Sequence, residues 1–191
     1  MSRAEFAERF PGAIILPWEG TWPTIADDAF IAPGAVVIGN VSVGSQSSIW
    51  FQTVVRGDIA PITIGERSSV QDCTVVHVNM DAPTVIGNDV TIGHSALVHG
   101  TTIHDGVLVG MGAIIMSYSV VGAGAVIAAG ALIPERVSVP AHAVMVGMPA
   151  KQRNALSDEQ AQHLAGIPGR YVRVSRQYIA ELTQMEEANE H

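Results

Sequence analysis

A repeat of six residues is the feature that most constrains the fold of this chain. An aliphatic residue recurs at almost every sixth position from Ile25 to Ile133, with two short insertions and one five-residue step from Val98 to Ile103. A period of six fits neither a 3.6-residue helix nor the two-residue alternation of a simple strand, and repetition of this kind is typical of a stacked solenoid. We therefore expect an all-β solenoid whose inward-pointing anchors are Ile25, Ile31, Val37, Val43, Ile49, Val55, Ile64, Val70, Val76, Ile86, Ile92, Val98, Ile103, Val109, Ile115, Val121, Ile127 and Ile133.

The repeat also predicts which side chains become neighbours. Three anchors make one triangular coil, and strands of adjacent coils should lie about 4.7 to 4.9 Å apart. His77 and His99 each follow the third anchor of consecutive coils, so their imidazoles should stack, with Arg56 in the same column directly before His77. His94 follows a second anchor by two places and should lie near a different corner. A neighbouring subunit could therefore supply His94 to the site of the other two histidines.

These histidines indicate a metal site. Neutral imidazole is the usual nitrogen ligand of zinc, and three protein ligands with one open position are typical of a catalytic site rather than a closed structural one. Cys73 is the only cysteine, so the sequence offers neither a cysteine-based zinc knuckle nor a disulfide framework. We predict that His77, His94 and His99 are the metal ligands.

Both ends of the chain depart from the repeat. Residues 1–24 should form an irregular or short-strand segment that covers one end of the core, and the insertions at 60–63 and 82–85 should form loops beside the histidine column. Beyond Pro134 the repeat is expected to decay. Helices should begin at Ser157 and near Pro168, which divides the chain into a β-helix domain with its N-terminal segment (1–153) and a helical appendage (154–191). An apolar stripe should pack along the coil or against another subunit, and it contains Tyr171, Val174, Tyr178, Leu182 and Met185.

The composition favours an oligomer. Hydrophobic residues make up 48% of the chain and charged residues only 15%, so much of the surface should be neutral or covered by other subunits. The net charge of −8, without clusters of Lys and Arg, argues against nucleic acid or an anionic membrane as a partner. No signal peptide and no apolar run of membrane-spanning length is visible, so we expect a cytoplasmic location.

Seven short motifs together resemble the gamma-class carbonic anhydrases and their bacterial homologues, over about residues 12–153. They are Arg56-Gly57-Asp58, Gln71-Asp72 in SSVQD, the VVH ending at His77, the IGH ending at His94, the VHG containing His99, VGMGA and GMPAK. The resemblance implies a left-handed parallel β-helix with a C-terminal α-helix and a homotrimer that hydrates CO2 reversibly to bicarbonate. It also implies a zinc site, with iron or cobalt as alternatives, in which one subunit supplies His77 and His99 and its neighbour supplies His94.

The resemblance implies roles for four more residues. Arg56 and Asp58 would form a salt bridge across the subunit interface, and Gln71 would hydrogen-bond the metal-bound hydroxide. Tyr171 resembles a C-terminal tyrosine that some members place near the metal, although a place in the helix stripe explains it equally well.

Two departures from the family pattern affect proton transfer. The prototype has a Glu directly after its Arg-x-Asp motif and a long acidic loop between its first two histidines, whereas here Ile59 follows Asp58 and only 16 residues separate His77 from His94. Asp81 is the only acid between His77 and the next anchor, Ile86. Three alternative functions therefore stay open: a hexapeptide-repeat acyltransferase, an acyl-CoA thioesterase, and a non-catalytic metal-binding trimer.

Overall fold

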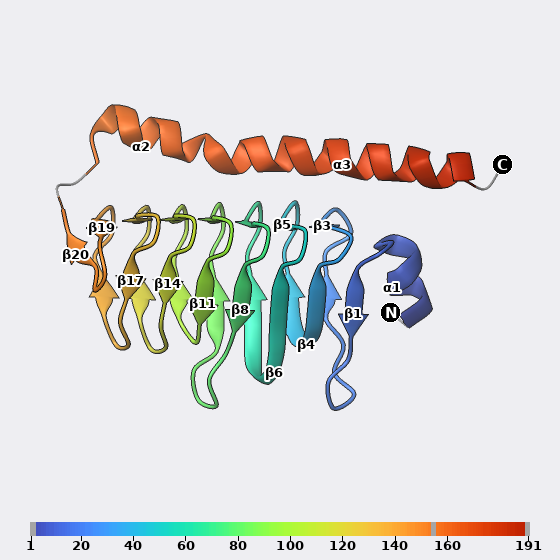
Figure 1. Ribbon diagram of the computed structural model, residues 1–191, viewed down its shortest axis with the longest axis horizontal. Coiled ribbons are helices and arrows are strands. Elements are labelled where there is room, and N and C mark those ends of the chain that lie inside the picture. The colour runs from blue at the N-terminus through green and yellow to red at the C-terminus, as the bar shows by residue number, and fades with distance from the viewer. Residues whose placement is uncertain (1–2, 154–155, 190–191) are drawn as a thin grey trace.

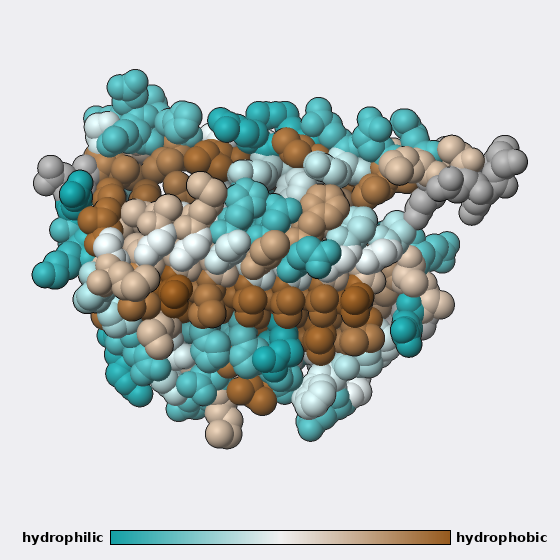
Figure 2. All heavy atoms as spheres, in the orientation of Figure 1, coloured by the Kyte–Doolittle hydropathy of each residue, from teal (hydrophilic) through white to brown (hydrophobic). Residues whose placement is uncertain are grey.

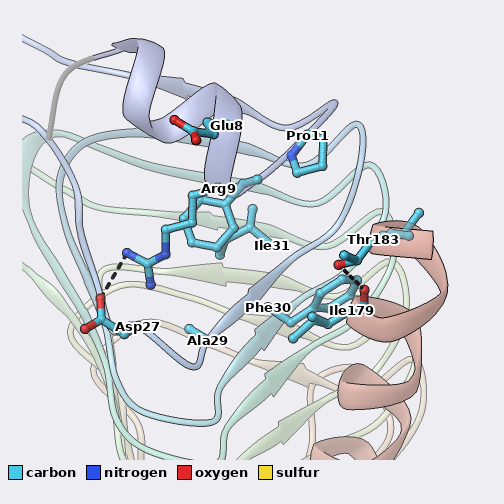
Figure 3. A pocket seen from close by; sticks show the side chains of 11 residues that line it. Glu8, Arg9, Pro11, Asp27, Ala29, Phe30, Ile31, Ile179 and Thr183 are labelled. Carbon is cyan, nitrogen blue, oxygen red and sulfur yellow. Dashed lines mark hydrogen bonds and ion pairs between the residues drawn. The ribbon is translucent and has the colours of Figure 1, made fainter. Parts of the chain in front are cut away.

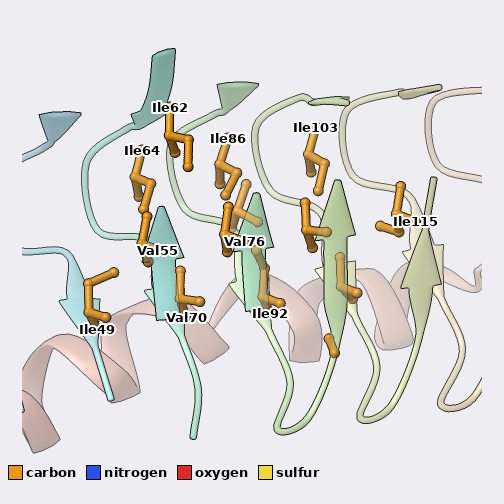
Figure 4. Packing of buried hydrophobic residues seen from close by; sticks show 14 of the residues in the cluster. Ile49, Val55, Ile62, Ile64, Val70, Val76, Ile86, Ile92, Ile103 and Ile115 are labelled. Atoms are coloured by element: carbon orange, nitrogen blue, oxygen red, sulfur yellow. The ribbon is translucent and has the colours of Figure 1, made fainter. Parts of the chain in front are cut away.

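The chain folds as a parallel β-solenoid with an α-helix along one side, as the sequence predicts (Figure 1). The computed structural model describes residues 3–153 and 156–189. Every one of the eighteen predicted anchors is at most 6% exposed. Figure 4 shows some of them stacked in columns along the coils, among them Val55, Val76 and Ile92. Burial of a Val or Ile side chain contributes about 1.5 to 3 kcal/mol, so these columns supply most of the hydrophobic stabilisation of the coils.

The strands form three flat faces. The helix-side face, which lies under the C-terminal helix, contains β3 (Phe30–Ile31), β5 (Ser48–Ile49), β7 (Ser69–Val70), β10 (Thr91–Ile92), β13 (Leu108–Val109), β16 (Val126–Ile127), β19 (Val144–Val146) and β20 (Lys151–Gln152). The histidine face contains β1 (Ile14–Leu16), the first halves of β4 (Val36–Val43) and β6 (Val54–Ile64), β8 (Val75–His77), β11 (Leu97–His99), β14 (Ile114–Ile115) and β17 (Leu132–Ile133). The third face contains β2 (Thr24–Ile25), the second halves of β4 and β6, β9 (Thr84–Ile86), β12 (Thr102–Ile103), β15 (Val120–Val121) and β18 (Ser138–Val139).

The predicted loop at 60–63 is wrong, because the whole segment belongs to β6. The strand runs around the corner from one face to the next, and its second half, ending at Ile64, pairs with β4 on one side and β9 on the other. Pairing on both sides satisfies backbone groups that a loop would leave to water. The second insertion does form an excursion, but it ends at β9, and an antiparallel bridge between Asn79 and Ala82 closes its tip.

The ends of the solenoid differ from the expectation in two ways. Residues 3–9 form a helix, α1 (Arg3–Arg9), whose Phe6 is buried in the core. Arg9 fastens this helix to the first coil, since its guanidinium donates to the carbonyls of Ile25 and Ala26 and pairs with Asp27 at 3.4 Å (Figure 3). At the other end the repeat does not decay at Pro134, because Val139 and Met145 continue the buried columns through β18 and β19.

The C-terminal helices lie along the helix-side face. They are α2 (Asp158–Ala165), which Ser157 caps, and α3 (Ile167–Asn189). The predicted stripe packs on the coil: Tyr171, Val174 and Leu182 contact a cluster formed by Phe30, Ala32 and Trp50, while Met185 is exposed. No helix in the described ranges is long and apolar enough to cross a membrane.

Candidate metal centre

Strands β8 and β11 place two imidazoles side by side. His77 and His99 are direct register partners in the parallel ladder, because each ends its strand at the same position of successive coils. Nδ1 of His77 lies 3.1 Å from Nε2 of His99, and the ring centroids are 5.1 Å apart. The stacking that the hexapeptide repeat predicts therefore brings two imidazole nitrogens to within the span of one metal ion.

The outer nitrogen of each ring is held by a polar side chain. Nε2 of His77 lies 2.8 Å from Oδ1 of Asp58, and Nδ1 of His99 lies 2.8 Å from Oγ of Ser117. Burial alone would raise the pKa of Asp58, but hydrogen bonds from His77, the backbone and Arg56, together with the charge of Arg56, outweigh it and hold the pKa below its ordinary value. An ionised Asp58 can only accept, so His77 donates its Nε2 proton to it; in the neutral form of His77 the lone pair then lies on Nδ1.

His99 also favours its neutral form. Burial lowers the pKa of His99, and the neighbouring charges of His77 and Arg56 lower it further. If the Nδ1 proton of His99 goes to Ser117, the lone pairs of His77 Nδ1 and His99 Nε2 face one another, which is unfavourable unless a cation lies between them. Two nitrogens of a tetrahedral zinc site with bonds of about 2.0 to 2.1 Å are separated by about 3.3 Å. The observed pair fits two ligands of such a site.

Arg56 lies in the column before His77 and forms an ion pair with Asp58 inside the same chain. The two residues are neighbours because side chains two positions apart in a strand point to the same side. The resemblance assigns this pair to a contact between subunits, whereas the structure already joins it within one subunit. Asp58 therefore connects Arg56 to His77.

His94 lies at a different corner, together with Asp72. Nδ1 of His94 is 2.7 Å from Oδ2 of Asp72, and the backbone N–H of Ser95 donates to the carbonyl of Asp72 at 2.9 Å. Asp72 and Cys73 form the turn that precedes β8, whereas His77 ends that strand, so His94 and the histidine pair lie at opposite ends of β8. Within the described parts of a single chain, no three His, Cys, Asp or Glu side chains meet in a metal-binding group. One chain therefore presents a histidine pair and, at a separate corner, a single histidine.

Gln71 accompanies the His94 corner rather than the histidine pair. Its backbone N–H donates to the carbonyl of Ile92, one coil further along. The residue is only 4% exposed, and its side-chain amide makes no hydrogen bond to a described residue. Tyr171 packs edge-on against Trp50 on the helix-side face, with ring centroids 6.1 Å apart. In the single chain, Tyr171 therefore belongs to the helix stripe.

Sequence reasoning missed two residues near the histidine pair. Ser117 follows Met116, which the coil count places next to His99 in the following coil, so careful counting could have found it. Tyr118 donates to Oδ1 of Asp81 at 2.6 Å, and the guanidinium of Arg136 lies 4.2 Å from the centre of its ring. No sequence signal connects these three residues, because they come from three different coils.

Comparisons with known proteins place this architecture among its relatives. Residues 100–135 match the family described as bacterial transferase hexapeptide (six repeats). The chain is 44% identical over 151 residues to the probable carbonic anhydrase of Methanocaldococcus jannaschii, which covers 79% of this chain and 95% of that protein. It is 38% identical over 165 residues to the mitochondrial gamma carbonic anhydrase 2 of Arabidopsis thaliana, covering 83% of this chain but only 59% of the plant protein's length.

A solved structure agrees with the fold. The crystal structure of a putative acetyltransferase from Bacillus cereus superposes with a TM-score of 0.86 at 38% identity and covers 87% of this chain and 97% of that one. The identity to full-length relatives, the matching repeat and the paired histidines lead to one conclusion. This chain belongs to the gamma carbonic anhydrase family.

Proposed function

We propose that this protein is a metal-dependent carbonic anhydrase that acts as a homotrimer and hydrates CO2 reversibly to bicarbonate at its subunit interfaces. In this proposal His77 and His99 of one subunit and His94 of its neighbour hold a zinc ion, with iron or cobalt as alternatives. The observation that carries the proposal is the facing pair of imidazole nitrogens, 3.1 Å apart, whose outer nitrogens are held by Asp58 and Ser117.

An exposed apolar column supports assembly through the histidine face. Figure 2 shows an apolar band that runs across the strands of this face. Val75 and Leu97, the outward residues of β8 and β11, are 40% and 38% exposed, and Ile14 continues the column at the first coil. A contiguous apolar surface of this kind is typical of an interface. Because the column lies between the His94 corner and the histidine pair, an interface here would join the two halves of the site.

Each side chain of the site has a task in this proposal. A bound zinc ion supplies Lewis acidity, which lowers the pKa of water enough to provide a nucleophile for CO2 near neutral pH. Asp58 and Ser117 orient the rings of His77 and His99, as hydrogen-bonded partners of metal-binding histidines commonly do. The side-chain amide of Gln71 makes no hydrogen bond within the described residues and is available to hydrogen-bond the reacting group from the His94 side.

Metal content and CO2 hydration, measured together on wild type and His94→Ala, test the proposal. Wild type should bind about one zinc ion per subunit and hydrate CO2. His94→Ala should lose zinc while its circular dichroism stays unchanged, because His94 contributes nothing to the core. His142→Ala, which removes an exposed histidine at another corner, should keep both zinc and activity. A zinc-loaded wild type without CO2 hydration would contradict the proposed reaction.

An acyl transfer to or from coenzyme A is the second candidate, because the B. cereus relative is described as a putative acetyltransferase. Such an enzyme uses one histidine as general base and does not need a facing pair. Calorimetry with acetyl-CoA distinguishes acyl transfer from CO2 hydration, because acetyl-CoA binding that persists in the metal-free protein would favour acyl transfer. A thioesterase would in addition release free coenzyme A from acetyl-CoA.

A further inference from the structure

The hydration reaction needs a proton acceptor at the surface. One CO2 and one water give one bicarbonate and one proton, and this proton must leave the site before the next turnover. Asp58 is a poor acceptor, because one of its oxygens contacts His77 and the other forms an ion pair with Arg56. The residue that follows it, Ile59, cannot accept a proton. The acceptor must come from elsewhere in the fold.

A pocket beside Asp58 contains such a group. Its volume is about 300 Å³, and its lining includes Trp18, Glu19, Asn40, Asp58, Ile59 and Pro61. Glu19 comes from the start of the chain, about forty residues before Asp58, and reaches the pocket because β1 and β4 stack in register below β6. Glu19 therefore shares a solvent-accessible space with the carboxylate that contacts His77.

The turn that carries Glu19 is fixed by its backbone. Trp18 and Thr21 exchange two hydrogen bonds, of 3.0 and 2.8 Å, so that Glu19 and Gly20 form a two-residue turn. Trp18 and Ile59 are 47% and 51% exposed and give the pocket two apolar walls. Among the described residues, no hydrogen bond or ion pair involves the carboxylate of Glu19, so this group is available to water.

Two other acids lie near the histidine column. Asp81 accepts a hydrogen bond of 2.6 Å from Tyr118, whose ring is covered by Arg136. Glu135 is exposed and its charge acts on His99, but it does not line the pocket beside Asp58. Of these acids, Glu19 alone combines exposure and freedom from a partner in the described residues with a place in that pocket.

We infer that the Glu19 carboxylate accepts the proton released by CO2 hydration, through water in this pocket, and passes it to a buffer base in solution. This inference rests on the proposed carbonic anhydrase function. Ionised Glu19 becomes the neutral acid on the first transfer and is restored on the second, so no other reactant is needed. Glu19 acts through water and does not bind the metal.

Glu19→Gln in the zinc-loaded trimer tests the inference. In dilute buffer, kcat should fall by at least about tenfold while kcat/KM for CO2 changes little, because only proton export is slowed. Concentrated imidazole buffer should restore kcat, and Glu19→Asp should keep most of it. Asp81→Asn is the matched control and should lower kcat less than Glu19→Gln. An unchanged kcat in Glu19→Gln, or a larger loss in Asp81→Asn, would overturn the inference.

A second measurement does not depend on turnover. In protein loaded with Co²⁺ and labelled at the glutamate carboxyl carbons, the Glu19 signal should shift relative to the metal-free protein, whereas the signal of Glu66 at a distant corner should not. The Glu19 signal is identified by its absence from the spectrum of the Glu19→Gln variant. A Glu19 signal unmoved by bound cobalt would show that this side chain lies away from the site. Failure to bind cobalt at all would instead contradict the proposed metal centre, so the two failures are distinguishable.

Discussion

The hydrogen bond between Asp58 and His77 gives the sharpest test of how the histidine pair is organised. Asp58→Ala removes the acceptor that holds Nε2 of His77 at 2.8 Å and leaves the ring free to rotate or to change tautomer. Loss of such a partner typically lowers metal affinity 10- to 100-fold, which is about 1.4 to 2.7 kcal/mol. Asp58→Asn keeps a neutral acceptor of similar shape and should lose less, because hydrogen bonds to charged acceptors are about twice as strong as neutral ones.

The assay is zinc competition with a chromophoric chelator on the purified oligomer, read beside the thermal unfolding midpoint. Asp89→Asn is the matched control, because Asp89 forms a comparable pair of 2.8 Å hydrogen bonds with Arg67 at a corner without metal-binding histidines. Zinc affinity should decrease in the order wild type and Asp89→Asn, then Asp58→Asn, then Asp58→Ala. Zinc binding by Asp58→Ala at wild-type strength would refute the assigned role of Asp58.

Four further predictions concern the core, the assembly, the coil stacking and the pH dependence. Ile92→Ala should lower the free energy of unfolding in urea by about 2 to 5 kcal/mol and Ile92→Val by about 0.5 to 1.5, because Ile92 is completely buried. Leu97→Glu puts a charge into the exposed apolar column and should yield monomers in sedimentation velocity with unchanged circular dichroism; a persistent trimer would exclude this face. Gly110→Ala should lower the unfolding midpoint, since a Cβ there would lie 2.4 Å from the backbone nitrogen of Ala129 in the next coil. The free energy of unfolding of the metal-free protein should decrease as the pH falls through 6.5. Burial lowers the pKa of His99 in the folded state, so in this pH range the unfolded chain binds more protons than the folded one. In urea titrations at several pH values, His99→Gln should show a smaller dependence of stability on pH.

The local pattern of the chain was enough to predict the solenoid. Each coil repeats the same six-residue unit, so burial of one anchor per unit determines both the face and the register. The same count predicted that His77 and His99 would be stacked and that His94 would lie apart, because position within a repeat fixes position around the coil. Side chains outside the repeat, such as those of α1, carry no such information.

What the sequence by itself determined was therefore the solenoid and the columns along it, including the histidine pair. Only the tertiary structure decided which residues contact that pair, since Asp58 and Ser117 come from different coils, and that Glu19 shares a pocket with Asp58. It also decided that β6 turns a corner as one strand and that Tyr171 packs on Trp50. The physical reason is the distance along the chain over which each pattern acts. A hexapeptide repeat specifies contacts between equivalent positions of neighbouring coils, whereas turns and helices find their partners only when the whole chain packs.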